Sequence, residues 1–460
     1  MNMSTKHALG RKIVFRAVAS LSVLFWLAGH AAEVAHGQPA EPDKIAEVER
    51  GERDTANAAW WGFDLEDSTE TLQAAFDSGA RTVVIPDTGS DWIVRPLELR
   101  SDQTVFFEDG VRLLAKEGEF HGRSDSMLRG ENLENIRLIG YGAEIQMRKE
   151  DYMSEDYVDA EWRMCIALYS CRNVEIKGLT LSDSGGDGIY LGNLRENGVR
   201  PYNEDVTIRD VVCENNYRQG LSVISARNLL VENSAFNRTS GTGPSAGIDL
   251  EPNRPDEELT NVVIRNCVFI DNENLGMHMW FGHVTDESPP IDVLWEGNYV
   301  RGGRVGIHVN DLPRGQSSGE VVYRGNIVED SEHAGILVRR TGVDTAHLRF
   351  EDLVLYNTAW REGSAFGGDS APIALNAQWD TEGTYDRQGG LTFTNVHVIN
   401  EELGGRPVLR VNGNDAFEAW DDVEGVITAT VLDGQGYDEV NAPLGERFSL
   451  ELNPGHSLNR

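Results

Sequence analysis

Cysteine, positive charge and long apolar runs are all scarce in this chain. The four cysteines in 460 residues form no Cys-x-x-Cys pair and no cluster with histidine, which argues against a zinc site. Their spacing matches no disulfide framework, so we expect free thiols buried in the core. After the N-terminal segment, no apolar run is long enough to cross a bilayer. The cysteines are Cys165, Cys171, Cys213 and Cys267.

The shortage of positive charge excludes whole classes of partner. Lys and Arg number 41 against 75 Asp and Glu, which gives a formal net charge of −34. This balance disfavours binding to nucleic acid or to an anionic membrane, and it disfavours a polyanionic substrate unless the site carries local cations. Its simplest role is solubility.

Residues 1–37 have the pattern of a secretory signal peptide. A basic stretch that ends at Arg16 precedes an apolar run, 17–28, which is too short for a typical membrane span. Cleavage after Ala31 or Gly37 would fit the small residues found there. We therefore expect a secreted or periplasmic protein.

A five-residue pattern of glycine, aliphatic, any residue, aliphatic, any residue recurs six times in the middle of the chain. The repeats lie about 30 residues apart, a spacing typical of stacked coils that share one core. Short strand patterns and Asn-rich turns separate them, which favours a parallel β-helix with asparagine ladders between coils. The repeats are Gly188-Ile-Tyr-Leu-Gly192, Gly220-Leu-Ser-Val-Ile224, Gly247-Ile-Asp-Leu-Glu251, Gly276-Met-His-Met-Trp280, Gly306-Ile-His-Val-Asn310 and Gly335-Ile-Leu-Val-Arg339.

The pattern weakens toward both ends of the chain. Residues 38–62 are polar and predict a linker or lead-in, while Asp67-Ser-Thr-Glu70 resembles a capping box that begins a short helix. We expect this helix to cover the open end of the coil, whose unpaired edge needs protection. The sequence thus predicts one all-β solenoid over 63–430 and a C-terminal cap over 431–460.

The opening coils carry a family resemblance. The segment from Asp67 to Gly110, followed by Cys171-Arg-Asn-Val-Glu-Ile-Lys-Gly-Leu-Thr180, resembles the pectate-lyase and polygalacturonase superfamily. The resemblance implies a right-handed parallel β-helix and an enzyme that acts on polysaccharides at the outer face of one stacked sheet. The superfamily also contains adhesins and phage tailspikes. Gly185-Gly-Asp-Gly188 matches the polygalacturonase pattern only in part, so no catalytic residue is transferred.

The two variable positions of each repeat point away from the core, because side chains alternate between the faces of a strand. Neighbouring coils lie about 4.8 Å apart, so equivalent positions should form two columns. These columns combine carboxylates, imidazoles, an indole and a guanidinium, a mixture that indicates a site. The first column is Tyr190, Ser222, Asp249, His278, His308 and Leu337, and the second is Gly192, Ile224, Glu251, Trp280, Asn310 and Arg339.

Glycoside hydrolysis is slightly favoured by this arrangement. Asp249 and Glu251 stand two residues apart on one strand, with β-carbons about 6.5–7 Å apart, which is compatible with an inverting pair that holds a water. Adjacent like charges would raise the pKa of one group and make it the acid. His278 and His308 would then bind hydroxyl groups.

β-Elimination at a uronic acid, or C5 epimerisation, fits the same columns. His278 or His308 would remove the C5 proton, and Arg339 with Asn310 would neutralise the carboxylate. Tyr190 would protonate the leaving oxygen. Both chemistries stay open at this point.

Four further expectations complete the sequence analysis. We expect Asp187, Tyr190, Trp280 and Asn310 to bind substrate, with Asp187 at the rim and the exposed Trp280 ring against a sugar face. No cofactor is required, although Ca²⁺ is an alternative partner of the carboxylates. A polysaccharide is the expected partner of a monomer, with a trimer as the alternative. A non-catalytic glycan-binding surface protein is the remaining alternative.

Overall fold

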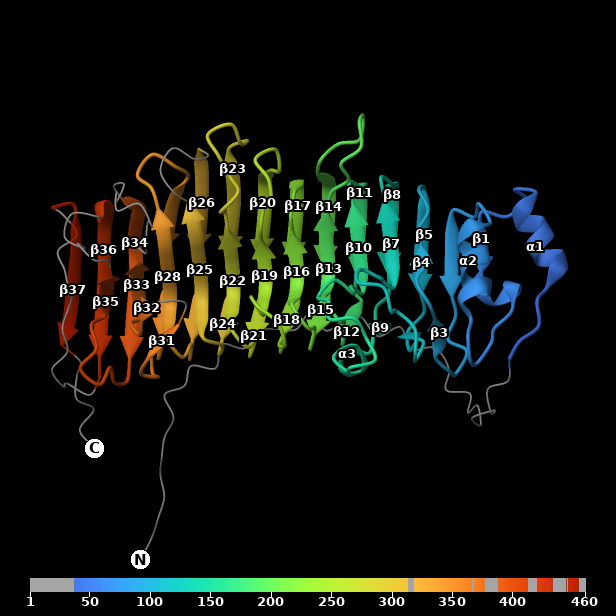
Figure 1. Cartoon of the computed structure of the whole chain (residues 1–460), viewed down its shortest axis with the longest axis horizontal. Helices are drawn as coiled ribbons and strands as arrows, with labels where there is room; N and C mark the ends of the chain where they lie inside the picture. Colours follow the sequence, from blue (N-terminus) through green and yellow to red (C-terminus); the bar gives the residue numbers. More distant parts are fainter. Residues whose placement is uncertain are drawn as a thin grey trace, which may run out of the picture. The chain divides into compact units, whose positions relative to one another are not determined.

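Short strands stack coil upon coil along one axis, as Figure 1 shows. The computed structural model describes residues 37–312, 318–365, 368–376, 388–412, 420–432, 444 and 446–454. The expected signal peptide lies outside the described residues, apart from Gly37. In the described part of the chain, no helix is long and apolar enough to span a membrane.

The described strands form two long sheets of parallel neighbours and one small antiparallel pair. The larger sheet comprises β1 (Thr55–Asn57), β2 (Thr82–Ile85), β3 (Trp92–Val94), β5 (Gln103–Phe107), β6 (Arg112–Ala115), β8 (Glu134–Ile139), β9 (Glu144–Gln146), β11 (Arg172–Lys177), β12 (Thr180–Ser182), β14 (Asn203–Arg209), β15 (Val212–Glu214), β17 (Ala226–Glu232), β18 (Ala235–Asn237), β20 (Leu259–Arg265), β21 (Val268–Ile270), β23 (Ile291–Glu296), β24 (Tyr299–Arg301), β26 (Gly319–Arg324), β27 (Ile327–Glu329), β29 (His347–Glu351), β30 (Val354–Tyr356), β34 (Gln388–Asn400), β36 (Trp420–Val431) and β37 (Phe448–Pro454).

The second sheet contains every glycine-led strand of the repeat. Its strands run in chain order from one end of the coil to the other, so each strand is paired with the equivalent strand of the next coil. They are β4 (Leu97–Glu98), β7 (Leu128–Glu131), β10 (Ile166–Tyr169), β13 (Asp187–Gly192), β16 (Gln219–Val223), β19 (Ala246–Leu250), β22 (Leu275–Trp280), β25 (Val305–Leu312), β28 (Ala334–Thr341), β33 (Ile373–Asn376) and β35 (Leu409–Asn412), and the antiparallel pair is β31 (Ser364–Ala365) and β32 (Gly368–Asp369).

Apolar side chains at equivalent positions stack on one another inside the coil. Trp295 and Tyr323 have ring centroids 6.0 Å apart, and the Tyr323 and Phe350 centroids are 5.3 Å apart. Phe350 then stacks on Phe393 at 5.1 Å. All four are in register in successive strands of the larger sheet. The in-register repeat therefore turns a sequence pattern into one continuous core.

The repeat glycines are explained by the close approach of the coils. A β-carbon on Gly188 would lie 2.7 Å from the carbonyl oxygen of Gly220, and one on Gly220 would lie 2.6 Å from that of Gly247. Backbone atoms cannot move aside as a flexible side chain can, so any larger residue would push the coils apart. The glycines are thus a packing requirement.

An asparagine ladder joins successive coils, as expected, and it lies within strands β14, β17 and β20. Asn261 Nδ2 donates to Asn228 Oδ1 over 2.9 Å, and Asn228 Nδ2 donates to Asp205 Oδ1 over 2.8 Å. All three residues have positive φ, a conformation that Asn and Asp adopt more readily than other non-glycine residues. These asparagines therefore have a structural role.

The helices α1 and α2 lie at the beginning of the coil, beside β1, whereas the short α3 lies further along it, near β12 (Figure 1). The expected helix is α2, in which Leu72, Ala75 and Phe76 are buried in the core. The lead-in expected over 38–62 is partly ordered, because it contains a helix, a strand and a 3-10 turn whose apolar residues join that core. The helices are α1 (Pro42–Glu49), η1 (Ala58–Trp61), α2 (Thr69–Asp77) and α3 (Lys149–Tyr152).

The far end differs from the expectation of a separate cap. β36 and β37 continue the parallel pairing of the larger sheet as far as Pro454, so strands of the coil extend into 431–460. Sequence periodicity is weak there, yet Val431 and Leu444 remain buried. The four cysteines are free and buried, as expected.

Candidate active site

The predicted columns are aligned on the second sheet. Strand pairing places Tyr190 beside Ser222, Ser222 beside Asp249, Asp249 beside His278, and His278 beside His308. The strands that carry them lie side by side in Figure 1, from green β13 to orange β28. The register deduced from the repeat is therefore correct for the first column.

The second column is aligned over its last three residues, Trp280, Asn310 and Arg339. Glu251 follows directly after β19, and its backbone N–H donates to Val223 O over 2.9 Å. Ile224, for which an exposed position would be unusual, is buried. Strand pairing thus confirms the predicted second column for its last three residues.

The outer face is far less open than an ordinary sheet surface. Asp187 and Asp249 are fully buried, and His308 is only 2% exposed. The expectation that Asp187 lies at the rim is therefore wrong. Glu251 keeps 19% of its side chain exposed, which makes it the accessible carboxyl of the group.

Asp249 lies at the centre of the site with a partner on each side. Gln219 Nε2 donates to Asp249 Oδ2 over 2.9 Å, and His278 Nδ1 lies 2.9 Å from Asp249 Oδ1. Burial alone would raise the pKa of Asp249, but its interactions with His278 and Arg218 hold it below its usual value. Asp249 is therefore ionised at neutral pH.

Glu251 has the opposite electrostatic environment. Burial and the negative charge of Asp249 raise the pKa of Glu251 to about 8. Its interaction with the Asp249 carboxyl group also favours the protonated form of Glu251. The two carboxyl groups therefore influence each other's protonation, and the water expected between them stays a prediction.

Arg218 links Glu251 to a third carboxyl group. Its Nη2 donates to Glu251 Oε2 over 3.1 Å, and its Nη1 lies 3.8 Å from Asp187 Oδ2. Burial raises the pKa of Asp187 to about 7, although the charge of Arg218 opposes this effect. Arg218 therefore interacts electrostatically with three clustered carboxyl groups, those of Asp187, Asp249 and Glu251.

The two imidazoles are parallel neighbours. The rings of His278 and His308 have centroids 4.9 Å apart and an interplanar angle of 6°. Burial, with the neighbouring His278 and Arg339, holds the pKa of His308 well below its usual value. His308 is therefore neutral, and it supports the ring of His278.

Arg339 carries a charge that is poorly compensated. Burial and the nearby Arg340 lower the pKa of Arg339, and Asp311 only partly offsets them. Asp311 forms its ion pair with Arg340 instead. Among the described residues no ion pair of Arg339 is found, so its guanidinium group is available to an anion.

The expected substrate-binding residues are partly engaged with the protein. Trp280 Nε1 donates to Asp311 Oδ2 over 2.7 Å, and Asn310 Nδ2 donates to the same oxygen over 3.0 Å. The Tyr190 ring packs against Tyr169 with centroids 5.6 Å apart. Trp280 is partly buried, so its ring is less exposed than expected, and Asn310 and Tyr190 are also largely covered.

Loops that leave the ends of these strands form a wall beside Glu251. Arg195, in the loop after β13, pairs with Asp256 and with Glu257 of the loop after β19. Asn193 Nδ2 adds a hydrogen bond of 2.8 Å to Glu257 Oε1. These contacts fix two loops against each other at the edge of the site.

Comparison with known proteins identifies the fold. Residues 156–352 match the family model for the right-handed beta helix region. The chain is similar to the Family 28 exopolygalacturonase of Yersinia enterocolitica, with a TM-score of 0.58 and 15% identity over 87% of this chain and 78% of that chain. The protein is a right-handed parallel β-helix.

Two other solved structures share this β-helix. The mannuronan C-5 epimerase AlgE4 A-module of Azotobacter vinelandii gives a TM-score of 0.57 at 14% identity, over 86% of this chain and 99% of that chain. A tailspike protein mutant of E. coli bacteriophage HK620, in complex with pentasaccharide, gives 0.56 at 15% identity, over 87% and 76%. A search of curated proteins finds no match. At these identities the likeness establishes the fold alone.

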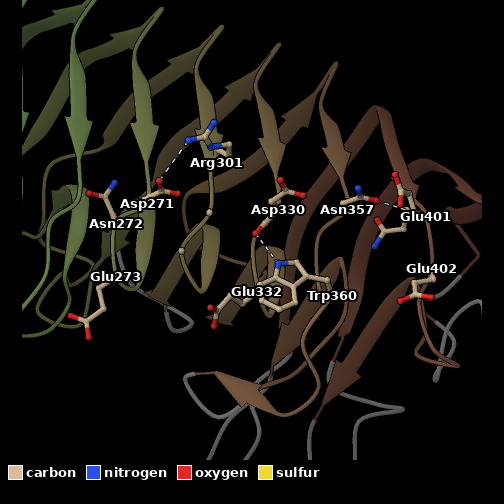
Figure 2. A pocket seen from close by; sticks show the side chains of 13 residues that line it. Asp271, Asn272, Glu273, Arg301, Asp330, Glu332, Asn357, Trp360, Glu401 and Glu402 are labelled. Carbon is tan, nitrogen blue, oxygen red and sulfur yellow. Dashed lines mark hydrogen bonds and ion pairs between the residues drawn. The ribbon is translucent and has the colours of Figure 1, made fainter. Parts of the chain in front are cut away.

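A separate pocket lies at the turns that precede the glycine-led strands. Figure 2 shows its carboxylates around the exposed Trp360 ring, and its volume is about 650 Å³. None of the residues predicted for the site line this pocket of the β-helix. Its lining consists of Asp271, Asn272, Glu273, Arg301, Gly302, Gly303, Asp330, Glu332, Asn357, Trp360, Asn400, Glu401 and Glu402.

Sequence reasoning missed Arg218 and Gln219. Both stand just before the repeat glycine Gly220, and Gln219 pairs in register with Asp187, the residue just before Gly188. The residue before the glycine thus forms a third column, which the inclusion of Asp187 already indicated. Applying the same reasoning to the residue before Gly220 would have identified Gln219. Nothing in the repeat pattern indicates Arg218.

Proposed function

We propose that the protein is a secreted carbohydrate-active enzyme that hydrolyses a glycosidic bond of a polysaccharide at the outer face of the second sheet. The main support for this proposal is a contrast between the pKa values of two neighbouring carboxyl groups. The pKa of Glu251 is raised to about 8, while that of Asp249 is lowered. Two carboxyl groups pushed apart in this way provide an acid and an anion at the same pH.

Glu251 is the general acid of the proposed reaction. It is protonated at neutral pH, it is the most accessible of the three carboxyl groups, and it stands beside the loop wall. A carboxylic acid that keeps its proton at neutral pH can donate it to the glycosidic oxygen as the bond breaks. Asp187 and Asp249 are buried and act through their neighbours.

Asp249 and His278 together supply the base. The contact of 2.9 Å between Asp249 Oδ1 and His278 Nδ1 favours the tautomer with its proton on Nδ1. Nε2 is then free to take a proton from the attacking water, and the ionised Asp249 stabilises the imidazolium that forms. Gln219 holds Asp249 in place, because its Oε1 accepts from Ala246 N over 3.0 Å.

The comparisons support a polysaccharide substrate. One similar structure is an exopolygalacturonase, and another is a tailspike protein in complex with pentasaccharide. An outer face with an acid, a histidine and a partly exposed tryptophan suits a sugar chain. We assign this protein to the same broad class of activity.

A second candidate is elimination or C5 epimerisation at a uronic acid. It is favoured by Arg339, whose charge is not balanced by an ion pair among the described residues. In that reaction His278 would remove the C5 proton and Arg339 would offset the substrate carboxylate. The similarity to a mannuronan C-5 epimerase supports this candidate.

A polysaccharide panel read in two ways separates the candidates. The purified protein is incubated with neutral and acidic glycans, and both reducing ends and absorbance near 235 nm are followed. Hydrolysis gives reducing ends without absorbance, whereas elimination gives both. The variants Glu251→Gln and Arg339→Met are run beside the wild type, with Glu287→Gln in an exposed loop as the control.

The expected result is hydrolysis that Glu251→Gln lowers by about 10²- to 10⁴-fold, the usual contribution of general acid–base catalysis. Glu287→Gln should keep the wild-type rate. New absorbance in the wild type that is lost in Arg339→Met would show that the reaction is elimination and not hydrolysis. Binding of a glycan without turnover or C5 inversion would identify a non-catalytic binding protein.

A further inference from the structure

Arg218 lies between two carboxyl groups that depend on it. The backbone N–H of Arg218 donates to Gly186 O over 2.9 Å, which ties the residue to the preceding coil. Its side chain is 11% exposed, so the guanidinium group is confined within the protein. It reaches Glu251 with Nη2 and faces Asp187 with Nη1. This geometry fixes the charge relative to both groups.

Asp187 is a buried carboxyl group with few partners. Both of its oxygens are buried, an interaction with Ser222 lowers its pKa, and among the described residues Arg218 is the cation paired with it, at 3.8 Å. Asp249 differs, because Gln219 and His278 both lie 2.9 Å from its carboxyl oxygens. Asp187 and Glu251 therefore share the same guanidinium group.

We infer that Arg218 is the positioning residue of the acid: it holds the Glu251 carboxyl group and balances the negative charge that Glu251 acquires when it donates its proton, while Asp187 keeps Arg218 in place. This inference rests on the proposed hydrolysis. Arg218 makes no contact with the reacting atoms and acts through Glu251.

The proton step is balanced within the proposed reaction. The O–H bond of Glu251 and the glycosidic C–O bond break, and the glycosidic oxygen keeps the bonding electrons and gains the proton. Water forms the new C–O bond and gives its proton to His278 Nε2. Glu251 is then an anion 3.1 Å from Arg218, at which distance a charge-assisted hydrogen bond strengthens as the charge develops.

The charged groups around Arg218 set the direction of each effect. Asp187, Asp249, Glu251 and Glu161 all act on it. The charge of Arg218 lowers the pKa of Glu251, and the charge of Asp187 raises it. Removal of Arg218 and removal of the Asp187 charge should therefore move the ionisation of Glu251 in opposite directions.

The test compares pH profiles of hydrolysis for Arg218→Met, Arg218→Lys and Asp187→Asn. Arg218→Met should lower kcat by about 100-fold and move the basic limb of the kcat profile upward by about one pH unit. Arg218→Lys keeps the charge and should leave the limb in place. Asp187→Asn should move the limb downward. Arg227→Met, which removes a half-exposed arginine paired with Glu258, is the control.

The outcomes separate this inference from the proposed function. If Glu251→Gln keeps full hydrolysis, the assignment of the acid is wrong and the inference fails with it. If Glu251→Gln is inactive but no Arg218 or Asp187 variant moves the limb, only the inference is overturned. A purely structural Arg218 would lower activity equally at every pH. Should Arg218→Met fail to fold, the downward shift expected of Asp187→Asn, measured against the unmoved limb expected of Arg218→Lys, decides the question.

Discussion

Two acidic regions of this β-helix differ in what covers their carboxyl groups. At the turn pocket of Figure 2, Asp271 and Glu332 are at the surface and paired with Arg301 and Arg361. At the column site, three carboxyl groups are largely buried around the single Arg218. Exposed ion pairs contribute little energy because water screens them. The burial of the carboxyl groups, rather than their number, is what moves their pKa values towards neutral pH.

The largest expected difference between the regions is in activity. Asp249→Asn removes the charge that orients His278, so hydrolysis should fall by about 10²- to 10⁴-fold. Asp271→Asn, the matched change at a half-exposed aspartate of the turn pocket, should leave kcat unchanged. Initial rates on the best glycan of the panel provide the measurement. If both variants lost the same fraction of activity, the column site and the turn pocket would not differ in their importance for catalysis.

The next difference is in stability. Trp295 is fully buried in the aromatic stack, so Trp295→Ala should lower the free energy of unfolding by about 3–5 kcal/mol. Trp360 is 52% exposed at the turn pocket, and Trp360→Ala should cost at most about 1 kcal/mol, the value of its hydrogen bond to Asp330 O. Urea denaturation of the three proteins tests this. A larger loss from Trp360 would mean that the turn pocket belongs to the folding core.

The smallest effect is on the pH dependence of stability. The folded pKa values of Asp187 and Glu251, about 7 and about 8, lie above their ordinary values of 3.8 and 4.5. Such groups stabilise the fold fully at low pH, and this stability is lost as the pH rises through the folded values. The melting temperature should therefore fall from pH 6 to pH 9, and it should fall less in Glu251→Gln. Glu332→Gln should follow the wild type.

The second sheet was the most predictable part of the molecule. A glycine at the start of each repeat and alternation after it fixed which residues of β19, β22 and β25 face outward, and the pairing register agrees. The ends were harder to predict. β36 and β37 carry no clear repeat because their residues need only match the neighbouring coil, so nothing in their sequence distinguishes a coil from a cap.

By itself, the sequence determined the coil, its register and the identity of the residues that meet on one face, because strand alternation and a repeat of fixed length are local properties of the chain. Only the tertiary structure decided their protonation and their exposure. The pKa of Glu251 depends on Asp249, Arg218 and the burial that surrounding loops impose. Arg218 reaches the site from the turn before β16, and it does not stand at a repeat position. The sequence alone does not indicate its role, because charge interactions depend on distances in space rather than on spacing along the chain.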